Sequence, residues 1–342
     1  MVVTVAVLFA ILLFSVAVAV DTGRVTDERH MLQNGADAAA LALGFDCARD
    51  ETTCLVGATG RAQSLADGNA QDGRHAIDPT AGLLTNPAFN LTMVSIDAGV
   101  PLPPKSVAVA LRSQQPGQGA ADGTVSLSTT WEAVGAETPV RALAVAQWGP
   151  SVSETTLALT FSECEWRRGS GGGTVYPGPE IVLMLHEGNT PDPCATRPAH
   201  ANAPGQFGWL DNDDCLAQIE ADATTGGTPG NSVDQDCRDR FHRSTQTLLD
   251  TVQVIPIFDR ATGQGQGTEY HVIGFAGFRI TGWYLGGQYY APSVARAPCG
   301  RAGPRSGDER CIGGHFVRFT SLTGVPDPTA PDLGVRTARL IR

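Results

Sequence analysis

The first pattern along the chain is an unbroken apolar run at its start. Residues 1–20 carry no charge, and their only polar side chains are Thr4 and Ser15. A helix of this length spans about 30 Å, the thickness of the hydrocarbon core of a bilayer. The run predicts a transmembrane helix that is retained as an anchor. Ala17-Val18-Ala19 leaves an alternative, cleavage by a signal peptidase before Val20.

Apolar positions at helical spacing continue beyond this run. They advance by seven, four, three and four residues, which places them on one helix face: Val25, Leu32, Ala36, Ala39 and Leu43. Gly35 weakens such a helix by about 1 kcal/mol without ending it. We expect the helix to leave the membrane and continue toward Gly44, followed by a short acidic loop between Cys47 and Cys54.

From about residue 90 the pattern changes to alternating and β-branched positions between Gly and Pro turns, as in strands. Before the Trp-Gly-Pro run at 148–150 we predict a second helix at 56–68, with Ala62, Leu65 and Ala66 inward, and strands at 91–96, 106–111, 124–133 and 140–147. Beyond that run we predict strands at 155–165, 180–186, 251–258, 270–281 and 315–322, a short helix at 238–249, and loops at 169–173 and 262–267.

These elements predict an α+β fold in four regions. They are a transmembrane helix at 1–20, a helix-and-sheet region at 21–149, a β-rich domain at 150–325 and a flexible tail at 326–342. The composition agrees, because charged residues make up only 17% of the chain and it contains 40 Gly and 22 Pro. The net charge of -11, spread along the chain, argues against a nucleic-acid partner, since such a surface repels phosphates.

The cysteines indicate the compartment. There are eight, an even number, behind an apolar leader, which favours an oxidising extracytoplasmic environment: Cys47, Cys54, Cys164, Cys194, Cys215, Cys237, Cys299 and Cys311. No Cys-x-x-Cys occurs, so disulfides are favoured over the rival interpretation, zinc. Spacing favours the short loops Cys47–Cys54 and Cys299–Cys311. Cys215–Cys237 is expected next, which leaves Cys164–Cys194, although eight cysteines allow 105 pairings.

The orientation of the span is set by two conflicting signals. Arg24 and Arg29 follow the apolar run and nothing basic precedes it, so the positive-inside rule alone would place the bulk of the chain in the cytoplasm. The cysteines favour the opposite side. We give the cysteines more weight and expect a single-pass protein of the cytoplasmic membrane whose bulk is extracytoplasmic.

Several patterns associated with catalysis or metal binding are incomplete. The Gly-rich run at 169–173 lacks a following Lys-Ser/Thr, and His186 lacks the second His of a zinc protease. The Asp-rich run at 211–214 begins like a calcium loop, but Cys215 and Leu216 occupy its fifth and sixth positions. We interpret this run, and the nearby Asp234, Asp236 and Asp239, as solvated turn acids. We interpret His271 and His315 as structural, and Phe207 and Trp209 as core. No catalytic residue, cofactor or metal site is predicted.

The residues after the apolar run resemble a known family. Val20-Asp21-Thr22-Gly23-Arg24, then Arg29, then the run from Leu32 to Ala42 are similar to the N-terminal signature of TadE/TadG-like proteins of Flp (tight-adherence) pilus assembly. That signature is a hydrophobic span, a V-D-x-G-R exit and an L-Q-x-A-A-D-A-A-A-L-A helix. The resemblance covers about 40 residues and implies a membrane-anchored, pseudopilin-like structural component of a bacterial envelope, with other Tad subunits as partners.

The resemblance has limits. The Asp-x-Ser-x-Ser run of a von Willebrand A domain is absent, so the chain resembles the shorter members of the family. Residues 1–20 also lack the Gly cleavage site and the acidic residue of type IV prepilins. One long helix followed by a sheet is nevertheless a pilin-like arrangement.

A small-residue face on the predicted helix suits close packing against another helix, although these residues also simply favour helix formation: Gly35, Ala36, Ala39 and Ala40. Two other functions remain open. The first is an envelope-anchored adhesin or ligand-binding module, which exposed aromatic side chains and bound calcium would favour. The second is a secreted hydrolase, which a deep pocket with convergent acids or histidines would favour.

Overall fold

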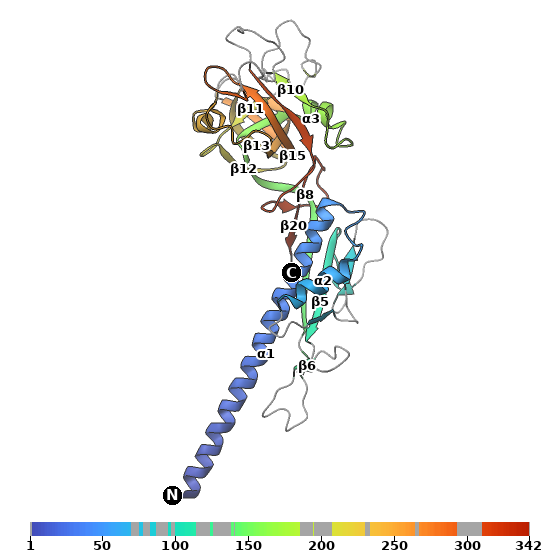
Figure 1. Cartoon of the computed structure of the whole chain (residues 1–342), viewed down its shortest axis with the longest axis vertical. Coiled ribbons are helices and arrows are strands. Elements are labelled where there is room, and N and C mark those ends of the chain that lie inside the picture. The colour runs from blue at the N-terminus through green and yellow to red at the C-terminus, as the bar shows by residue number, and fades with distance from the viewer. Residues whose placement is uncertain are drawn as a thin grey trace. The chain divides into compact units, whose positions relative to one another are not determined.

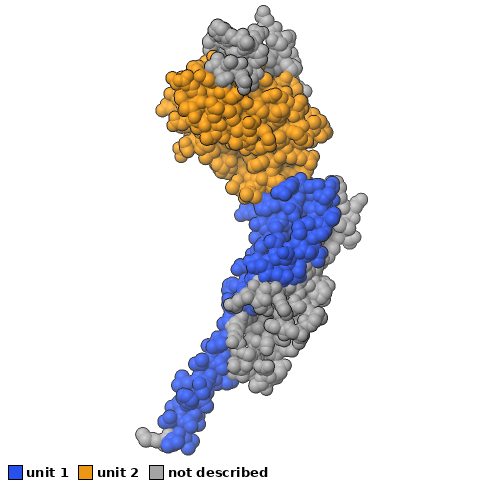
Figure 2. Space-filling model, viewed as in Figure 1, with its two compact units in different colours: residues 1–148, 338–342 blue, residues 149–337 orange. Residues whose placement is uncertain are grey.

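The chain forms two compact units, shown in Figure 2. In this computed structural model, unit 1 is residues 1–148 with 338–342, and unit 2 is residues 149–337. The described residues are 2–69, 75–77, 83–86, 95–96, 100–113, 124–125, 138–139, 141–184, 194, 207–229, 233–263, 267–292 and 310–341. The first division falls between Trp148 and Gly149, within the Trp-Gly-Pro run. The α+β class is confirmed, with sheets dominating.

Unit 1 begins with a single long helix. α1 runs from Val2 to Arg49 without interruption, so the apolar run and the amphipathic segment behind it are one helix (Figure 1). The second helix, α2, spans Ala58–Asp67 and begins after Gly57, whose positive φ of 68° turns the chain. Its buried positions lie four residues apart, at Ala58, Ala62 and Ala66. The inward assignment of Leu65 is wrong, because its side chain lies off this face and is 36% exposed.

The sheet of unit 1 is built around β5 (Ser106–Ser113) and β8 (Arg141–Leu157). They pair antiparallel from Ser106 opposite Gln147 to Arg112 opposite Arg141. The other edge of β5 pairs with β1 (His75–Ile77) and then with β2 (Leu83–Asn86). Two separate two-stranded sheets are β3 (Ser95–Ile96) with β4 (Val100–Pro101), and β6 (Thr124–Val125) with β7 (Thr138–Pro139). Most of the predicted strands 91–96 and 124–133 lies outside the described residues.

The core of unit 1 joins α1 to this sheet. One helix face meets alternate residues of the two strands, all inaccessible or nearly so: Leu32, Ala36, Ala39 and Leu43 of α1, Val107, Val109 and Leu111 of β5, and Ala142, Ala144 and Ala146 of β8. These residues face the core because side chains return to the same face every 3.6 residues on a helix and every second residue on a strand. A Cβ on Gly44 would lie 3.1 Å from the Cβ atoms of Ala146 and Ala338, so the backbones approach closely there.

Unit 2 is built on strands that close into a ring. β15 pairs with β13, β13 with β11, β11 with β9, β9 with β14, and β14 again with β15. β10, β16 and β17 extend this sheet: β9 (Leu159–Ser162), β10 (Ile181–Met184), β11 (Phe207–Leu210), β13 (Ala223–Pro229), β14 (Val252–Thr262), β15 (Thr268–Tyr284), β16 (Tyr290–Ala291) and β17 (Cys311–Val317). Closure gives each ring strand a partner on both sides along part of its length.

The core of unit 2 is aromatic. Phe161 meets Phe278 edge to face at 5.0 Å between ring centroids, and Phe241 contacts both Trp209 and Trp283 in the same way. These rings are fully buried, so the placement of Trp209 in the core is as expected. Edge-to-face pairs of this kind add to the free energy gained by burying each ring.

Two predicted elements of unit 2 are wrong in part. The expected strand at 155–165 ends at β9, and α3 (Glu163–Ser170) follows. Ser162 caps this helix by accepting a hydrogen bond from the Glu165 backbone, the Ser-x-x-Glu pattern that the strand interpretation overlooked. The helix expected at 238–249 is only α4 (Arg238–Phe241), behind a 3₁₀ turn at Gln235–Cys237, because the backbone becomes extended at His242.

The C-terminal segment is not the flexible tail expected at 326–342. It contains β19 (Val325–Pro326) and β20 (Val335–Leu340), and β20 pairs in parallel with β18 (Phe319–Thr320). Leu333 is buried, and its carbonyl oxygen accepts hydrogen bonds from Trp166 Nε1 and Tyr176 Oη, both at 3.0 Å. These long-range contacts hold the segment, and its short apolar pattern gave no sign of them.

Three disulfides lie within the described residues: Cys47–Cys54, Cys164–Cys194 and Cys215–Cys237. All three are pairs that the sequence predicted, Cys47–Cys54 from its spacing and Cys164–Cys194 by elimination. Cys311 is also disulfide-bonded, while Cys299 lies outside the described residues. Each bond closes a loop of 30 residues or fewer, which limits the conformational entropy of the unfolded chain.

Unit 2 also buries a carboxyl group among hydroxyl groups. Glu154, on β8, is 1% exposed, and its Oε2 accepts hydrogen bonds from Ser321 Oγ at 2.9 Å and Thr323 Oγ1 at 3.3 Å. Burial raises the pKa of Glu154, and the hydrogen bonds from neighbouring hydroxyls oppose this shift only in part. The folded state therefore favours the protonated acid more than the unfolded chain does.

This burial predicts a pH-dependent stability. Because the pKa of Glu154 is higher in the folded state, its contribution to stability is complete below the pKa of an unfolded Glu and is lost as the pH rises through the folded pKa. Glu154→Gln should remove that loss and stabilise unit 2 at neutral pH by roughly 1 kcal/mol, the scale of an uncompensated buried polar group. Denaturation of the full chain between pH 4 and 8 measures this. Equal pH slopes for Glu154→Gln and the exposed control Glu220→Gln would contradict the assignment.

The α1–sheet core predicts a second effect. Ala39 has no exposed surface, so Ala39→Leu overpacks the core of unit 1 and should cost about 1–3 kcal/mol. Ala38→Leu is the matched control, because it adds the same atoms at a half-buried position of the same helix. Chemical denaturation of the detergent-solubilised chain compares the two. Equal stability of both variants would show that this face does not pack on the sheet.

Candidate functional site

The N-terminal part of α1 is the first component of the candidate site. Residues Val2–Val20 have a mean hydropathy of 2.9, and none of this segment is buried within the chain. At about 1.5 Å per residue the segment is long enough to cross a bilayer core. It is a candidate membrane span or signal sequence, and no other helix among the described residues is long and apolar enough to cross a membrane.

Three hydroxyls in and just after this segment donate hydrogen bonds within the helix. Ser15 Oγ donates to the carbonyl oxygen of Ile11 at 2.8 Å, and Thr22 Oγ1 donates to that of Val18 at 2.8 Å. Thr26 Oγ1 does the same toward Thr22 at 2.9 Å. Such bonds let a hydroxyl enter an apolar phase without a water partner, so these side chains are compatible with a lipid environment.

The four small residues expected to pack against another helix are buried within the chain. Gly35, Ala36, Ala39 and Ala40 are all buried, and the three alanines have no exposed surface. The alanines belong to the core cluster that joins α1 to β5 and β8. The face is used for close packing within the chain, in a core that contains residues of β5 and β8 and also Ala58, Ala62 and Ala66 of α2. Because these residues are already covered, they leave no surface for a helix of another subunit.

A polar clasp fixes α1 beside this face. Gln33 Nε2 donates both to Asp37 Oδ1, one helical turn on, at 2.7 Å and to the carbonyl oxygen of Leu143 on β8 at 3.1 Å. The first bond orients the amide and the second ties it to the strand. The clasp therefore fixes the register of helix and sheet, which the alanine contacts alone specify less strictly.

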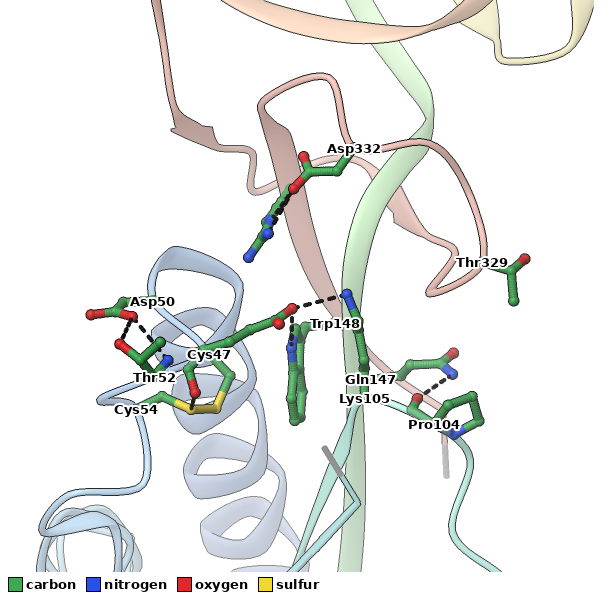
Figure 3. A network of polar contacts seen from close by, with 12 residues as sticks. Cys47, Asp50, Thr52, Cys54, Pro104, Lys105, Gln147, Trp148, Thr329 and Asp332 are labelled. Carbon is green, nitrogen blue, oxygen red and sulfur yellow. Dashed lines mark hydrogen bonds and ion pairs between the residues drawn. A yellow bond between two sulfur atoms is a disulfide. The ribbon is translucent and has the colours of Figure 1, made fainter. Parts of the chain in front are cut away.

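The C-terminal end of α1 is held by an ion pair to the sheet. Glu51 Oε1 lies 3.0 Å from Lys105 Nζ and accepts a hydrogen bond from Trp148 Nε1 at 3.2 Å. The Glu51 and Lys105 side chains are 19% and 16% exposed, so solvent screens the pair less than it would at the open surface. Figure 3 shows Lys105 and the Trp148 ring beside the Cys47–Cys54 disulfide that closes the following turn.

The turn after α1 is itself well ordered. Asp50 accepts hydrogen bonds from the Thr52 backbone and from the hydroxyls of Thr52 and Thr53. The Thr52 hydroxyl is the main reason that the pKa of Asp50 falls to about 2. Arg61 Nε pairs with Asp46 Oδ2 at 3.2 Å and ties α2 to the last turns of α1. The buried half of α1 is thus fixed along its length, and the apolar half extends from it.

The residues considered for chemistry form local structure. Asn212 Nδ2 donates to Asp234 Oδ1 at 3.2 Å, beside the Cys215–Cys237 disulfide, and Asp214 faces Arg240 at 3.5 Å. No group of three or more His, Cys, Asp or Glu side chains suited to a metal ion occurs among the described residues. His186 lies outside them.

Two predicted structural histidines have specific partners. His271 Nδ1 lies 2.7 Å from Asp259 Oδ1, and its Nε2 lies 3.4 Å from Asp222 Oδ1. His315 Nδ1 lies 3.1 Å from the carbonyl oxygen of Gly178. Both rings are part-buried, and each links segments that are distant in sequence.

Sequence reasoning missed the contacts that fix α1. Glu51, Lys105 and Trp148 are far apart in sequence and stand in no recognisable motif, and Trp148 drew notice only as a boundary residue. Gln33 stood inside the family-like run without an assigned role. The one local signal was Gln33 and Asp37 at a spacing of four, which is suited to a helix-surface pair.

Comparison with known proteins gives one match. No curated protein and no solved structure matches the chain significantly. A family model, Tad, described as "Putative Flp pilus-assembly TadE/G-like", matches residues 1–44. The matched residues cover the exposed apolar segment of α1 and most of the face that packs on the sheet. The N-terminal region of this chain therefore matches the TadE/G-like family of Flp pilus assembly, as its sequence signature suggested.

Proposed function

We propose that this chain is a membrane-anchored structural component of Flp pilus assembly. The observation that carries the proposal is the coincidence of the family match at residues 1–44 with a continuous helix whose first half is apolar and exposed. A structural role needs such a helix and needs no reactive group. The proposal assigns the helix to the membrane and the folded units to contacts with other pilus-assembly subunits.

The architecture of unit 1 supports a pseudopilin-like role. A long N-terminal helix lays its C-terminal half on an antiparallel sheet and leaves its N-terminal half uncovered. In that arrangement the sheet makes the helix rigid, and the uncovered half can enter a bilayer or an assembly. The clasp at Gln33 and the ion pair at Glu51 add to this rigidity because each ties the helix to the sheet.

The disulfides support an extracytoplasmic location for the bulk of the chain. Three bonds occur within the described residues, and such bonds persist in oxidising compartments. Arg24 and Arg29 after the apolar segment favour the reverse orientation. We give the disulfides more weight, because bonds in both units depend on the compartment while only two charges favour the alternative.

The anchor can be tested directly. In native membranes the chain should remain in the pellet after carbonate washing, and its N terminus should lie upstream of Val20. Leu12→Arg with Leu13→Arg should release it, because each Arg at the helix centre costs about 2.5–3.5 kcal/mol of insertion free energy. Leu12→Ile with Leu13→Ile is the matched control and should stay in the pellet. A soluble wild-type product beginning at Val20 would identify a signal peptide instead.

The role in assembly can be tested by complementation. A strain without this protein should lose or strongly reduce its Flp pili, counted by electron microscopy, and the full chain should restore them. The chain with Leu12→Arg and Leu13→Arg should fail to restore them, while His315→Gln, which alters a structural histidine, should succeed. Pulldown from native membranes should recover the pilus ATPase and platform proteins. Normal piliation in the deletion strain would end the proposal.

A further inference from the structure

Unit 2 contains a pocket of about 650 Å³ beside β8. Its lining includes Ser153, which pairs with Glu220 of β12 (Leu216–Glu220) and with Val325 of β19. The apolar part of its lining includes Val152, Ile273 and Val325, all of them half-buried. A volume of this size is typical of sites that enclose a small molecule or several side chains.

The charged part of the lining is entirely acidic. Glu220, Asp222 and Asp327 contribute carboxyl groups, and no Lys, Arg or His is among the described lining residues. The Asp222 side chain is 97% exposed, and its Oδ1 lies 3.4 Å from Nε2 of His271, just outside the lining. Hydrogen bonds from the Thr329 hydroxyl and backbone lower the pKa of Asp327, which keeps this carboxylate charged in mildly acidic solution. The pocket therefore combines an apolar surface with negative charge.

Three backbone N–H groups of the pocket lining are hydrogen-bonded within the chain. Ala221 N donates to the carbonyl oxygen of Val152 and Asp222 N to that of Val272, both at 2.8 Å, while Asp327 N donates to Pro150 at 2.9 Å. These three N–H groups are already paired within the chain, so they are not available as donors to an incoming segment. The three carboxylates do not form a metal-binding group by distance and geometry. An organic cation with an apolar body matches both the carboxylates and the apolar surface of the lining.

We propose that this pocket binds a basic, partly apolar segment of a partner protein, with a Lys or Arg at the acidic side and an apolar side chain on Val152, Ile273 and Val325. Lys and Arg suit it because they lay an aliphatic stem on apolar surface while the charged head meets a carboxylate. The volume exceeds that of one such side chain, which is why a segment is proposed. Charge complementarity with this acidic lining selects the partner. The inference goes beyond the proposed role in assembly and does not depend on it.

The test uses the full chain in non-ionic detergent and a fluorescent peptide, acetyl-Arg-Leu-Arg-amide, followed by anisotropy. Glu220→Gln with Asp222→Asn should weaken binding roughly two- to thirtyfold, the range for two exposed ion pairs. Ala330→Trp, which fills the pocket with a ring, should abolish binding. Asp239→Asn with Glu269→Gln is the matched control, because it removes the same charge from exposed positions of unit 2 that do not line the pocket, and it should bind like the wild type.

Circular dichroism of each variant confirms that it is folded. Acetyl-Glu-Leu-Glu-amide should not bind. The proposal is overturned if neither peptide binds, if both bind equally, or if the pocket variants bind the basic peptide like the wild type. Competition by spermidine distinguishes a further case. If spermidine displaces the peptide as effectively as unlabelled peptide does, the pocket recognises charge alone, and the proposal of a protein segment is wrong.

Discussion

The packing of α1 on β5 and β8 is the contact on which the rest of unit 1 depends. Small residues allow it, because Ala36, Ala39 and Gly44 bring the helix backbone close to strands that carry alanine at the facing positions. The contact converts an amphipathic helix of marginal stability into a rigid element. It also determines which part of α1 can contact other molecules. The covered face cannot contact other subunits, whereas the apolar segment before it is exposed.

Polar interactions then define the register of this packing. Alanine faces are smooth and would allow the helix to slide, whereas Gln33 and Glu51 each tie the helix to one place on the sheet. The Glu51 pair is half-shielded, and a Trp indole shares its carboxylate. Such a pair contributes more to the choice of one arrangement than to net stability, because desolvation offsets much of its attraction.

Unit 2 solves a different problem, the protection of strand edges. Its ring of five pairings needs no partner chain, and an aromatic cluster fills its interior. The C-terminal segment is fastened by two donors to the carbonyl oxygen of Leu333. Burying Glu154 costs free energy in this unit, and the hydroxyls of Ser321 and Thr323, just before that segment, offset part of the cost by donating to its carboxylate. The ring of unit 2 is thus closed, while β10 ends the part of the sheet that extends beyond it.

The sequence by itself determined the features that depend on local periodicity and spacing. The apolar run, the helix face from Leu32 to Leu43 and the strands at 106–111 and 270–281 follow from the residues alone, because neighbouring positions decide them. The family match at 1–44 was visible for the same reason. Only the tertiary structure decided what those elements meet. Whether Ala39 faced a helix or a sheet, whether the C-terminal residues were loose, and that Glu51 joined Lys105 and Trp148 all depend on contacts between residues distant in sequence. A small apolar face fits several partners about equally well, so the choice rests with the whole fold.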